Sequence, residues 1–106
     1  MRQDQFDLIR KWATEKGIYK KGDVATQFVK LSEEHGELAE AILKEDVDGQ
    51  IDAIGDMVVV LTNLAELINR ENPLWPNINI EVCVEAAWNQ IKNRKGSMKN
   101  GTFVKE

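Results

Sequence analysis

Residues 30–40, K-L-S-E-E-H-G-E-L-A-E, carry four glutamates among apolar residues that recur at helical spacing. Successive side chains of an α-helix are separated by about 100°, so each direction follows from its position. One apolar face is expected to be buried, and it consists of Val24, Phe28, Leu31, Leu38, Ala39 and Ile42. Glu34 and Glu37 lie beside that face, where they can look into an adjoining cleft. Glu33 and Glu40 point away from it, toward water.

The apolar periodicity and the helix-end signals on both sides of this segment predict an all-α fold with four helices. These helices are expected over residues 3–16, 24–44, 51–70 and 80–93. Gly17 is placed to end the first helix, and Asp23 is placed to cap the second.

The segments between the predicted helices are polar or contain helix breakers. A basic connector is expected over residues 18–22, an acidic turn over residues 45–50, and a loop over residues 71–79, which holds both prolines. The pair Asn100-Gly101 predicts a turn, so the segment 97–106 is expected to form a small hairpin or an extended arm.

The third helix is the most informative of the four. Its run M-V-V-V-L has strand propensity, but no helix breaker follows before Arg70, and so long a strand is improbable. A helix that is apolar on nearly every side is expected to be central and buried. One small subunit is expected to cover it incompletely, which predicts a homodimer or homotetramer that completes the four-helix bundle.

Size and composition predict a single domain over residues 1–106. Apolar residues make up 42% and charged residues 30%, and the net charge of −4 argues against a nucleic-acid-binding surface. A lone cysteine, Cys83, excludes an internal disulfide and favours a reducing compartment. The longest apolar run, residues 57–61, is too short to span a membrane, and charged residues near the N-terminus interrupt any signal-peptide pattern. We therefore expect a cytoplasmic protein without a membrane partner.

Asp56 is the residue for which a purely structural role is hardest to find. It lies in the middle of the apolar third helix, where an isolated carboxylate costs several kcal/mol unless it is paired or binds a cation. Asp52 lies one turn earlier on the same side, together with Val59 and Asn63 one and two turns later. If the second and third helices pack antiparallel, Glu34, Glu37, Asp52 and Asp56 converge. An all-oxygen site of this kind suits Mg²⁺, with Mn²⁺ as a substitute.

These residues carry a resemblance to a known superfamily. The segment K-L-S-E-E-H-G-E-L-A-E-A-I, followed by D-A-I-G-D-M-V-V-V-L, resembles the MazG-like branch of the all-α nucleoside triphosphate pyrophosphohydrolases. That superfamily has the signature E-E-x-x-E, a spacer, and then E-x-x-D. Glu33, Glu34 and Glu37 match the first half and Asp56 matches the end of the second. Alanine occupies the position three before Asp56, so Asp52 is taken as the substitute ligand.

The resemblance implies Mg²⁺-dependent hydrolysis of a nucleoside triphosphate to the monophosphate and pyrophosphate. Glu33 or Glu37 could then activate the attacking water. The residues that we expect to bind substrate are Trp12, Gln27, Lys30, Asn89, Lys92 and Asn93. Trp12 is expected to belong to a base pocket, and the last three resemble the superfamily's Asn/Lys-bearing substrate helix. An ordinary solvated face remains the alternative reading for that helix.

Two other interpretations compete with the hydrolase. A carboxylate-bridged di-iron bundle normally uses Glu-x-x-His pairs on two helices, which the single histidine, His35, cannot supply. The other is a non-enzymatic oligomeric adaptor whose acidic face binds a basic partner. The sequence does not reveal which base or sugar is preferred, because pocket shape decides that preference.

Overall fold

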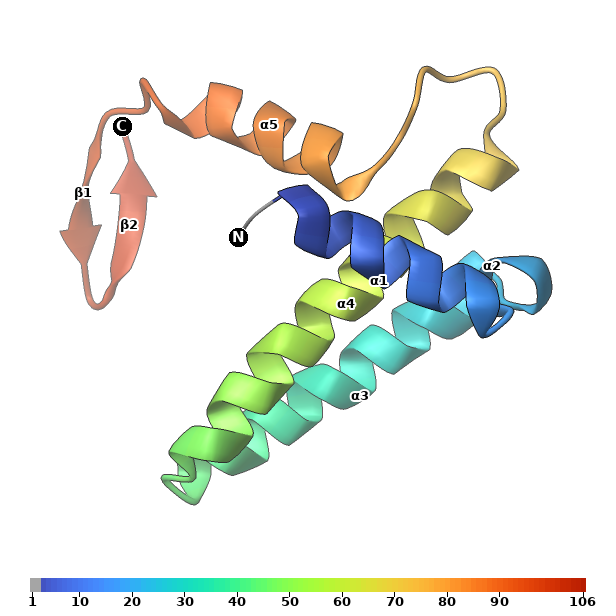
Figure 1. The fold of residues 1–106 in the computed structure, drawn as a ribbon. Helices are drawn as coiled ribbons and strands as arrows, with labels where there is room; N and C mark the ends of the chain where they lie inside the picture. The colour runs from blue at the N-terminus through green and yellow to red at the C-terminus, as the bar shows by residue number, and fades with distance from the viewer. Residues whose placement is uncertain (1–2) are drawn as a thin grey trace.

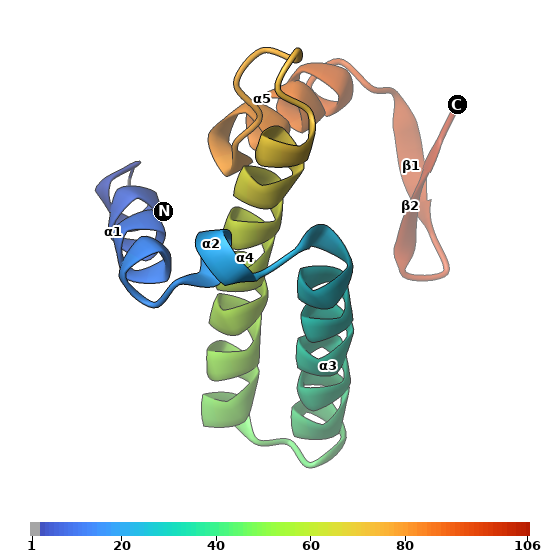
Figure 2. The ribbon, with the colours of Figure 1, turned by 90° about the vertical axis from the view of Figure 1, so that its right-hand side faces the viewer.

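The computed structural model describes residues 3–106 and confirms the predicted helical class (Figure 1). Its elements are α1 (Gln3–Glu15), α2 (Ile18–Lys21), α3 (Val24–Leu43), α4 (Val47–Glu71), α5 (Ile80–Ile91), β1 (Gly96–Lys99) and β2 (Thr102–Lys105). The helices α3 and α4 run side by side as an antiparallel pair, and α1 crosses α4 on one side (Figures 1 and 2). This pair forms the frame of the molecule.

The predicted basic connector over residues 18–22 is wrong in one respect, because it contains the short helix α2. Gly17 has a φ of +80°, which turns the chain after α1, and the N–H of Gly22 donates to the carbonyl of Ile18. The buried ring of Tyr19 anchors this turn in a small core with Ala13 and Leu67. Apolar anchoring, which the lysine-rich sequence conceals, therefore stabilises a helix in this connector.

The predicted acidic turn over residues 45–50 is also too long, because α4 begins at Val47. Asp46 caps the helix, its Oδ1 accepting a hydrogen bond from the N–H of Gly49 over 3.0 Å. Asp48 lies in the first turn, where its negative charge is favourable toward the helix dipole. Residues 44–46 therefore suffice to connect α3 to α4.

Gly49 has little room for a side chain at this connection. A Cβ built there would lie 2.5 Å from Asp46 Oδ2 and 3.3 Å from Ala41 Cβ, whereas at Gly36 it would meet no heavy atom within 4 Å. Gly49→Ala should therefore displace the cap and lower the free energy of unfolding by about 1 kcal/mol. The control Gly36→Ala should raise it by roughly 0.5–1 kcal/mol through helix propensity. Urea unfolding of both variants measures this difference, and equal effects would contradict it.

The buried face of α3 differs from the predicted apolar face. Phe28 is 59% exposed and Ile42 is 54% exposed, whereas the buried residues of α3 are Glu34 and Ala41. These two positions lie about a quarter turn around the helix from the apolar stripe. The reason is that α4 packs against the side of α3 that carries Glu34, so Val24, Leu31 and Leu38 are only half-buried and Phe28 and Ile42 stay on the outer surface.

The central position predicted for the third helix is confirmed for α4, which contacts α1, α2, α3 and α5. Its buried residues are Ala53, Val60, Thr62, Asn63, Ala65 and Leu67. The burial is uneven, because Val47, Ile51 and Ile54 in the first half remain exposed. The helix is thus buried mainly along its second half, where α1 and α2 cover it.

The last helix begins as predicted and ends earlier. Asn79 caps α5 by accepting from the N–H of Val82, and α5 ends at Ile91 rather than Asn93. Arg10 of α1 holds its first turn, donating from Nη1 and Nη2 to the two carboxylate oxygens of Glu81 over 2.8 and 2.7 Å. Every residue of α5 is exposed or half-buried, so α5 extends away from the α3–α4 pair instead of completing a four-helix bundle (Figure 1).

The C-terminal segment forms the hairpin that the Asn100-Gly101 pair predicts. Strands β1 and β2 are antiparallel, with Met98 opposite Phe103, and both turn residues have positive φ. All residues of the two strands are exposed, and the hairpin stands apart from α3 and α4 in both views (Figures 1 and 2). No helix among residues 3–106 has the length and apolarity needed to cross a membrane.

Candidate functional site

The antiparallel pairing of α3 and α4 brings three carboxylates together. One oxygen each from Glu34, Glu37 and Asp56 lies within 4.8 Å of the other two. Glu34 and Glu37 are about one turn apart on α3, and Asp56 faces them from α4. Three of the four residues predicted to bind metal thus converge in the structure.

Glu34 is the most constrained member of the cluster. It is 5% exposed, and its Oε2 is fully buried without a hydrogen-bond partner among the described residues. Its other oxygen lies 3.4 Å from Lys30 Nζ, and this contact raises the pKa of Lys30. A buried carboxylate oxygen without a donor costs free energy unless a cation approaches it. The environment of the Glu34 carboxylate therefore favours the binding of a cation.

Asp56 shows the same electrostatic crowding. Burial is the main cause that raises the pKa of its carboxyl group above the usual value, and the negative charges of Asp52 and Glu34 raise it further. Lys30 acts in the opposite direction. The folded chain therefore holds Asp56 where its ionised form is disfavoured, and a bound cation would reverse that penalty.

These residues fit a hard divalent cation. The donors are all carboxylate oxygens, which Mg²⁺ and Mn²⁺ prefer and which zinc and copper sites rarely use alone. The orphaned Oε2 of Glu34 supplies a buried position, and the exposed Glu37 keeps the cluster open to solvent. An open position is what a catalytic ion needs for water or substrate.

A cavity of about 330 Å³ adjoins the cluster. Its lining consists of Trp12, Ile18, Thr26, Gln27, Lys30, Glu34, Asp56, Val59, Val60 and Asn63. One end is acidic, and the rest combines aliphatic walls with a tryptophan, a composition typical of a small-molecule site. The structure thus brings three of the predicted substrate-binding residues, Trp12, Gln27 and Lys30, to the same cavity as two of the acids.

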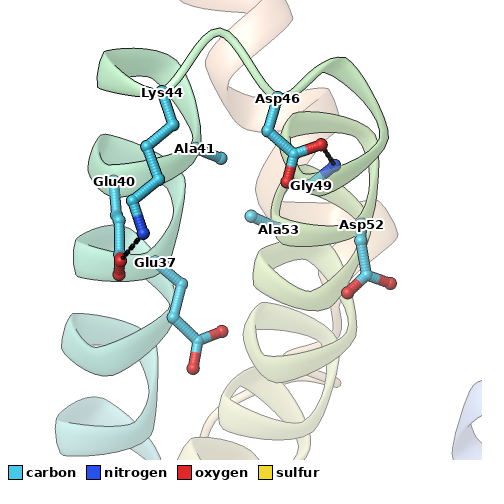
Figure 3. Close-up of a pocket in the computed structure, with 8 residues that line it drawn as sticks. All are labelled: Glu37, Glu40, Ala41, Lys44, Asp46, Gly49, Asp52 and Ala53. Atoms are coloured by element: carbon cyan, nitrogen blue, oxygen red, sulfur yellow. Dashed lines mark hydrogen bonds and ion pairs between the residues drawn. The ribbon is translucent and has the colours of Figure 1, made fainter.

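Asp52 and Glu33 lie outside the cluster. Asp52 is exposed and lines a second cavity, of about 240 Å³, at the closed end of the α3–α4 pair, where it points away from Glu37 (Figure 3). In the same view Lys44 pairs with Glu40, and Asp46 caps α4 (Figure 3). Glu33 is exposed, and its Oε2 lies 3.6 Å from Lys30 Nζ. Their predicted roles therefore have no direct support from the placement of their carboxylates.

Asn89, Lys92 and Asn93, which were also predicted to bind substrate, do not line the cavity that adjoins the cluster. Asn89 lies on α5, and Lys92 Nζ donates to Asn89 Oδ1 over 3.1 Å. Asn93 follows α5 and is exposed. The physical reason is the direction of α5, which follows the loop after α4 and runs away from the α3–α4 pair (Figure 1).

The sequence does not predict a role in the site for Tyr19 or Asn63. Tyr19 fell in the predicted connector, where nothing indicated burial, yet its hydroxyl donates to Asn63 Oδ1 over 2.7 Å. Asn63 was aligned with Asp56 by helical spacing, without a role assigned to it. Asn63 could have been recognised as Asp56 was, because it is a polar side chain in the most apolar helix.

Comparison with known proteins identifies the family of the chain. The model of the MazG nucleotide pyrophosphohydrolase domain matches residues 23–98, so the chain belongs to that family. A 58-residue stretch, 55% of the chain, is 38% identical to an uncharacterized 18.2 kDa protein of the rep-hol intergenic region of Haemophilus phage HP1, strain HP1c1. The match covers 36% of that phage protein, so the chain spans only part of its length. No solved structure matches.

Proposed function

We propose that this protein is a Mg²⁺-dependent nucleoside triphosphate pyrophosphohydrolase, which converts NTP or dNTP and water to the monophosphate and pyrophosphate. The observation that carries the proposal is the buried, unpartnered Oε2 of Glu34 within a three-carboxylate cluster that opens onto a cavity. Membership of the MazG family supports the pyrophosphohydrolase class. Its expected role is the cleaning of the nucleotide pool in the cytoplasm, where such substrates occur.

Glu34, Glu37 and Asp56 would hold the ion, and Asp52, which lies outside the cluster, would have to change its side-chain rotamer to become a fourth ligand. Mg²⁺, when bound, supplies charge neutralisation for the phosphate oxygens and lowers the pKa of a bound water. Lys30 lies between Glu33 and Glu34, at the edge of the cavity, where it can bind a phosphate oxygen. Lys30 and the bound Mg²⁺ would thus together supply the positive charge that an acidic protein needs to bind a triphosphate.

Glu37 is the better candidate for the general base. It is exposed and belongs to the cluster, so it can accept a proton from the attacking water. Glu33 points outward and pairs with Lys30, which suits it to orienting that lysine. Glu37→Gln should therefore reduce kcat far more than Glu33→Gln.

Release of pyrophosphate is the direct test of the proposal. The purified protein should convert canonical or modified triphosphates to monophosphate and pyrophosphate in equal amounts, only with Mg²⁺ or Mn²⁺ present. Chromatography of both products distinguishes this reaction from phosphatase activity, which would release inorganic phosphate. An adaptor protein would show neither turnover nor metal-linked nucleotide binding in calorimetry.

We further propose that the protein is a homodimer or homotetramer. Phe28 and Ile42 on the outer side of α3 are exposed apolar side chains, and so are the paired Met98 and Phe103 on one face of the hairpin. A two-stranded hairpin is marginally stable alone in water, so packing against a second copy would stabilise it.

Phe28→Asp is expected to dissociate the oligomer, because it places a charge in the proposed interface. Light scattering during gel filtration should show the mass of two or four chains for the wild type and a smaller mass for the variant. Leu74→Asp is the control, because Leu74 is in the loop before α5 and almost fully exposed. A monomeric wild type at micromolar concentration would refute the proposal.

A further inference from the structure

Asn63 is a buried amide in the wall of the cavity that adjoins the acid cluster. It is 2% exposed, and its Oδ1 accepts a hydrogen bond of 2.7 Å from the hydroxyl of Tyr19. Its side chain makes no other hydrogen bond within the described residues. The oxygen of the amide is therefore engaged, and the NH₂ group is what remains to meet a ligand.

Tyr19 fixes the direction of this amide. Its ring is buried, and the guanidinium carbon of Arg70 lies 5.0 Å from the ring centroid. Burial raises the pKa of the Tyr19 hydroxyl to about 12, so the phenol stays protonated and donates near neutral pH. Because the donor is held in place by its own packing, Asn63 presents Nδ2 to the cavity.

The position of Asn63 relative to the acids suits a nucleotide. Asp56 and Asn63 are seven residues apart on α4, which places them on the same face about 10 Å apart along the helix axis. Val59 and Val60 line the cavity between them, and Trp12 and Ile18 line it from α1 and α2. A phosphate group at the acids would thus leave the base against apolar walls, with its edge toward Asn63.

Resting on the proposed hydrolase function, we infer that Asn63 is a specificity-determining residue that donates from Nδ2 to a carbonyl oxygen on the base. The preferred substrates would then be nucleotides with an oxo group at that edge, as in uracil or hypoxanthine. Cytosine and adenine carry an amino group at the corresponding position, which would put two donors face to face. Tyr19 acts as a positioning residue, because it reaches the base only through Asn63.

The other polar groups of the cavity do not impose this preference. Thr26 lies at the start of α3, where its backbone N–H and its side chain both interact with Asp23. Gln27 is half-buried and makes no side-chain hydrogen bond within the described residues, so its amide can present either end. Of the two amides in the lining, Asn63 is the one whose orientation a second side chain fixes.

Matched pairs of substrates test the inference. UTP and CTP differ at position 4 of the ring, and ITP and ATP differ at position 6, each by an oxo group in place of an amino group. The wild type is expected to favour the oxo member of each pair about tenfold in kcat/KM, the effect of one buried hydrogen bond. Asn63→Asp replaces the donor with an acceptor and should lower each ratio at least tenfold.

Two further variants separate specificity from folding. Tyr19→Phe should move both ratios toward one, and it tests the inference if Asn63→Asp does not fold. Asn77→Asp, in the exposed loop before α5, makes the same charge change away from the cavity and should leave the ratios unaltered. Because each ratio is measured within one variant, partial unfolding does not change it.

The possible failures are distinguishable. If the wild type hydrolyses none of the four triphosphates, and calorimetry with UMP and CMP shows no binding, the proposed function and this inference fall together. If triphosphates are hydrolysed but the amino member is preferred, or folded Asn63 and Tyr19 variants keep the wild-type ratios, this inference alone is overturned.

Discussion

Glu34→Gln is expected to lower Mg²⁺-dependent turnover by at least about 100-fold, since groups that only support metal ligands already cost 10–100-fold when removed. The amide keeps the shape of the side chain and removes the charge that the ion requires. Asp56→Asn and Glu37→Gln should have effects of similar size, because the three carboxylates form one cluster. Steady-state kinetics with saturating Mg²⁺ measure the loss.

Glu40→Gln serves as the matched control, because it makes the same change on α3 at an exposed carboxylate that Lys44 engages over 2.5 Å. Its turnover should equal that of the wild type. Metal-free Glu34→Gln should be at least as stable as the wild type, since it removes the negative charge from a buried group whose Oε2 has no donor in the described part of the chain, and it weakens only the contact of 3.4 Å with the exposed Lys30. Full turnover in Glu34→Gln or Asp56→Asn would show that the active site lies elsewhere.

The second large effect is stabilisation by the metal. Binding to the folded state alone, at 100 times the dissociation constant, adds about 2.7 kcal/mol, which corresponds to a rise in Tm of roughly 10–20 °C for a domain of this size. Thermal unfolding with and without Mg²⁺ should show this rise in the wild type and its loss in Glu34→Gln. An equal rise in both proteins would mean that the ion binds elsewhere.

The pH dependence of this stabilisation has a defined sign. In the metal-free fold the pKa of Asp56 is raised, so above its unfolded value the folded state holds more protons there than the unfolded chain does. Asp56 therefore destabilises the metal-free protein increasingly as pH rises through the interval from its unfolded to its folded pKa. Mg²⁺ needs the ionised carboxylate, so its effect on Tm should grow over that interval.

Comparison with Asp56→Asn isolates this contribution. Without metal, the Tm of the variant relative to the wild type should increase as pH rises from about 4 toward neutral, because the amide does not ionise. A difference in Tm that is constant across that range would contradict the raised pKa.

The features that the sequence predicts correctly are those that depend on a single helix or turn. Helical spacing predicts that Glu34 and Glu37 share one side of their helix, and the structure places both beside Asp56. The turn at Asn100-Gly101 and the end of α1 at Gly17 followed from local backbone preferences. These features depend on neighbours within a few residues.

Other features depend on the relative rotation of elements, which spacing does not provide. The apolar stripe of α3 predicted the buried face, but α4 packs about a quarter turn away, and Phe28 stays outside. Helical spacing places Asp52 on the same side of α4 as Asp56. One turn of helix nevertheless separates them, and the two residues line different cavities. Tyr19 shows the same limit, because its partner Asn63 is 44 residues away.

The brevity of the link between α3 and α4 has a consequence for how such a site can evolve. With only residues 44–46 between the two helices, the side of α4 that faces α3 depends on how the chain leaves this link, and a longer link would no longer fix it. The length of the link therefore constrains the geometry of the three-carboxylate cluster together with the acids themselves. Related chains that keep the cluster are therefore expected to keep this link short, whereas the loop over residues 72–79, which connects α4 to α5, lies outside the α3–α4 pairing and can vary in length.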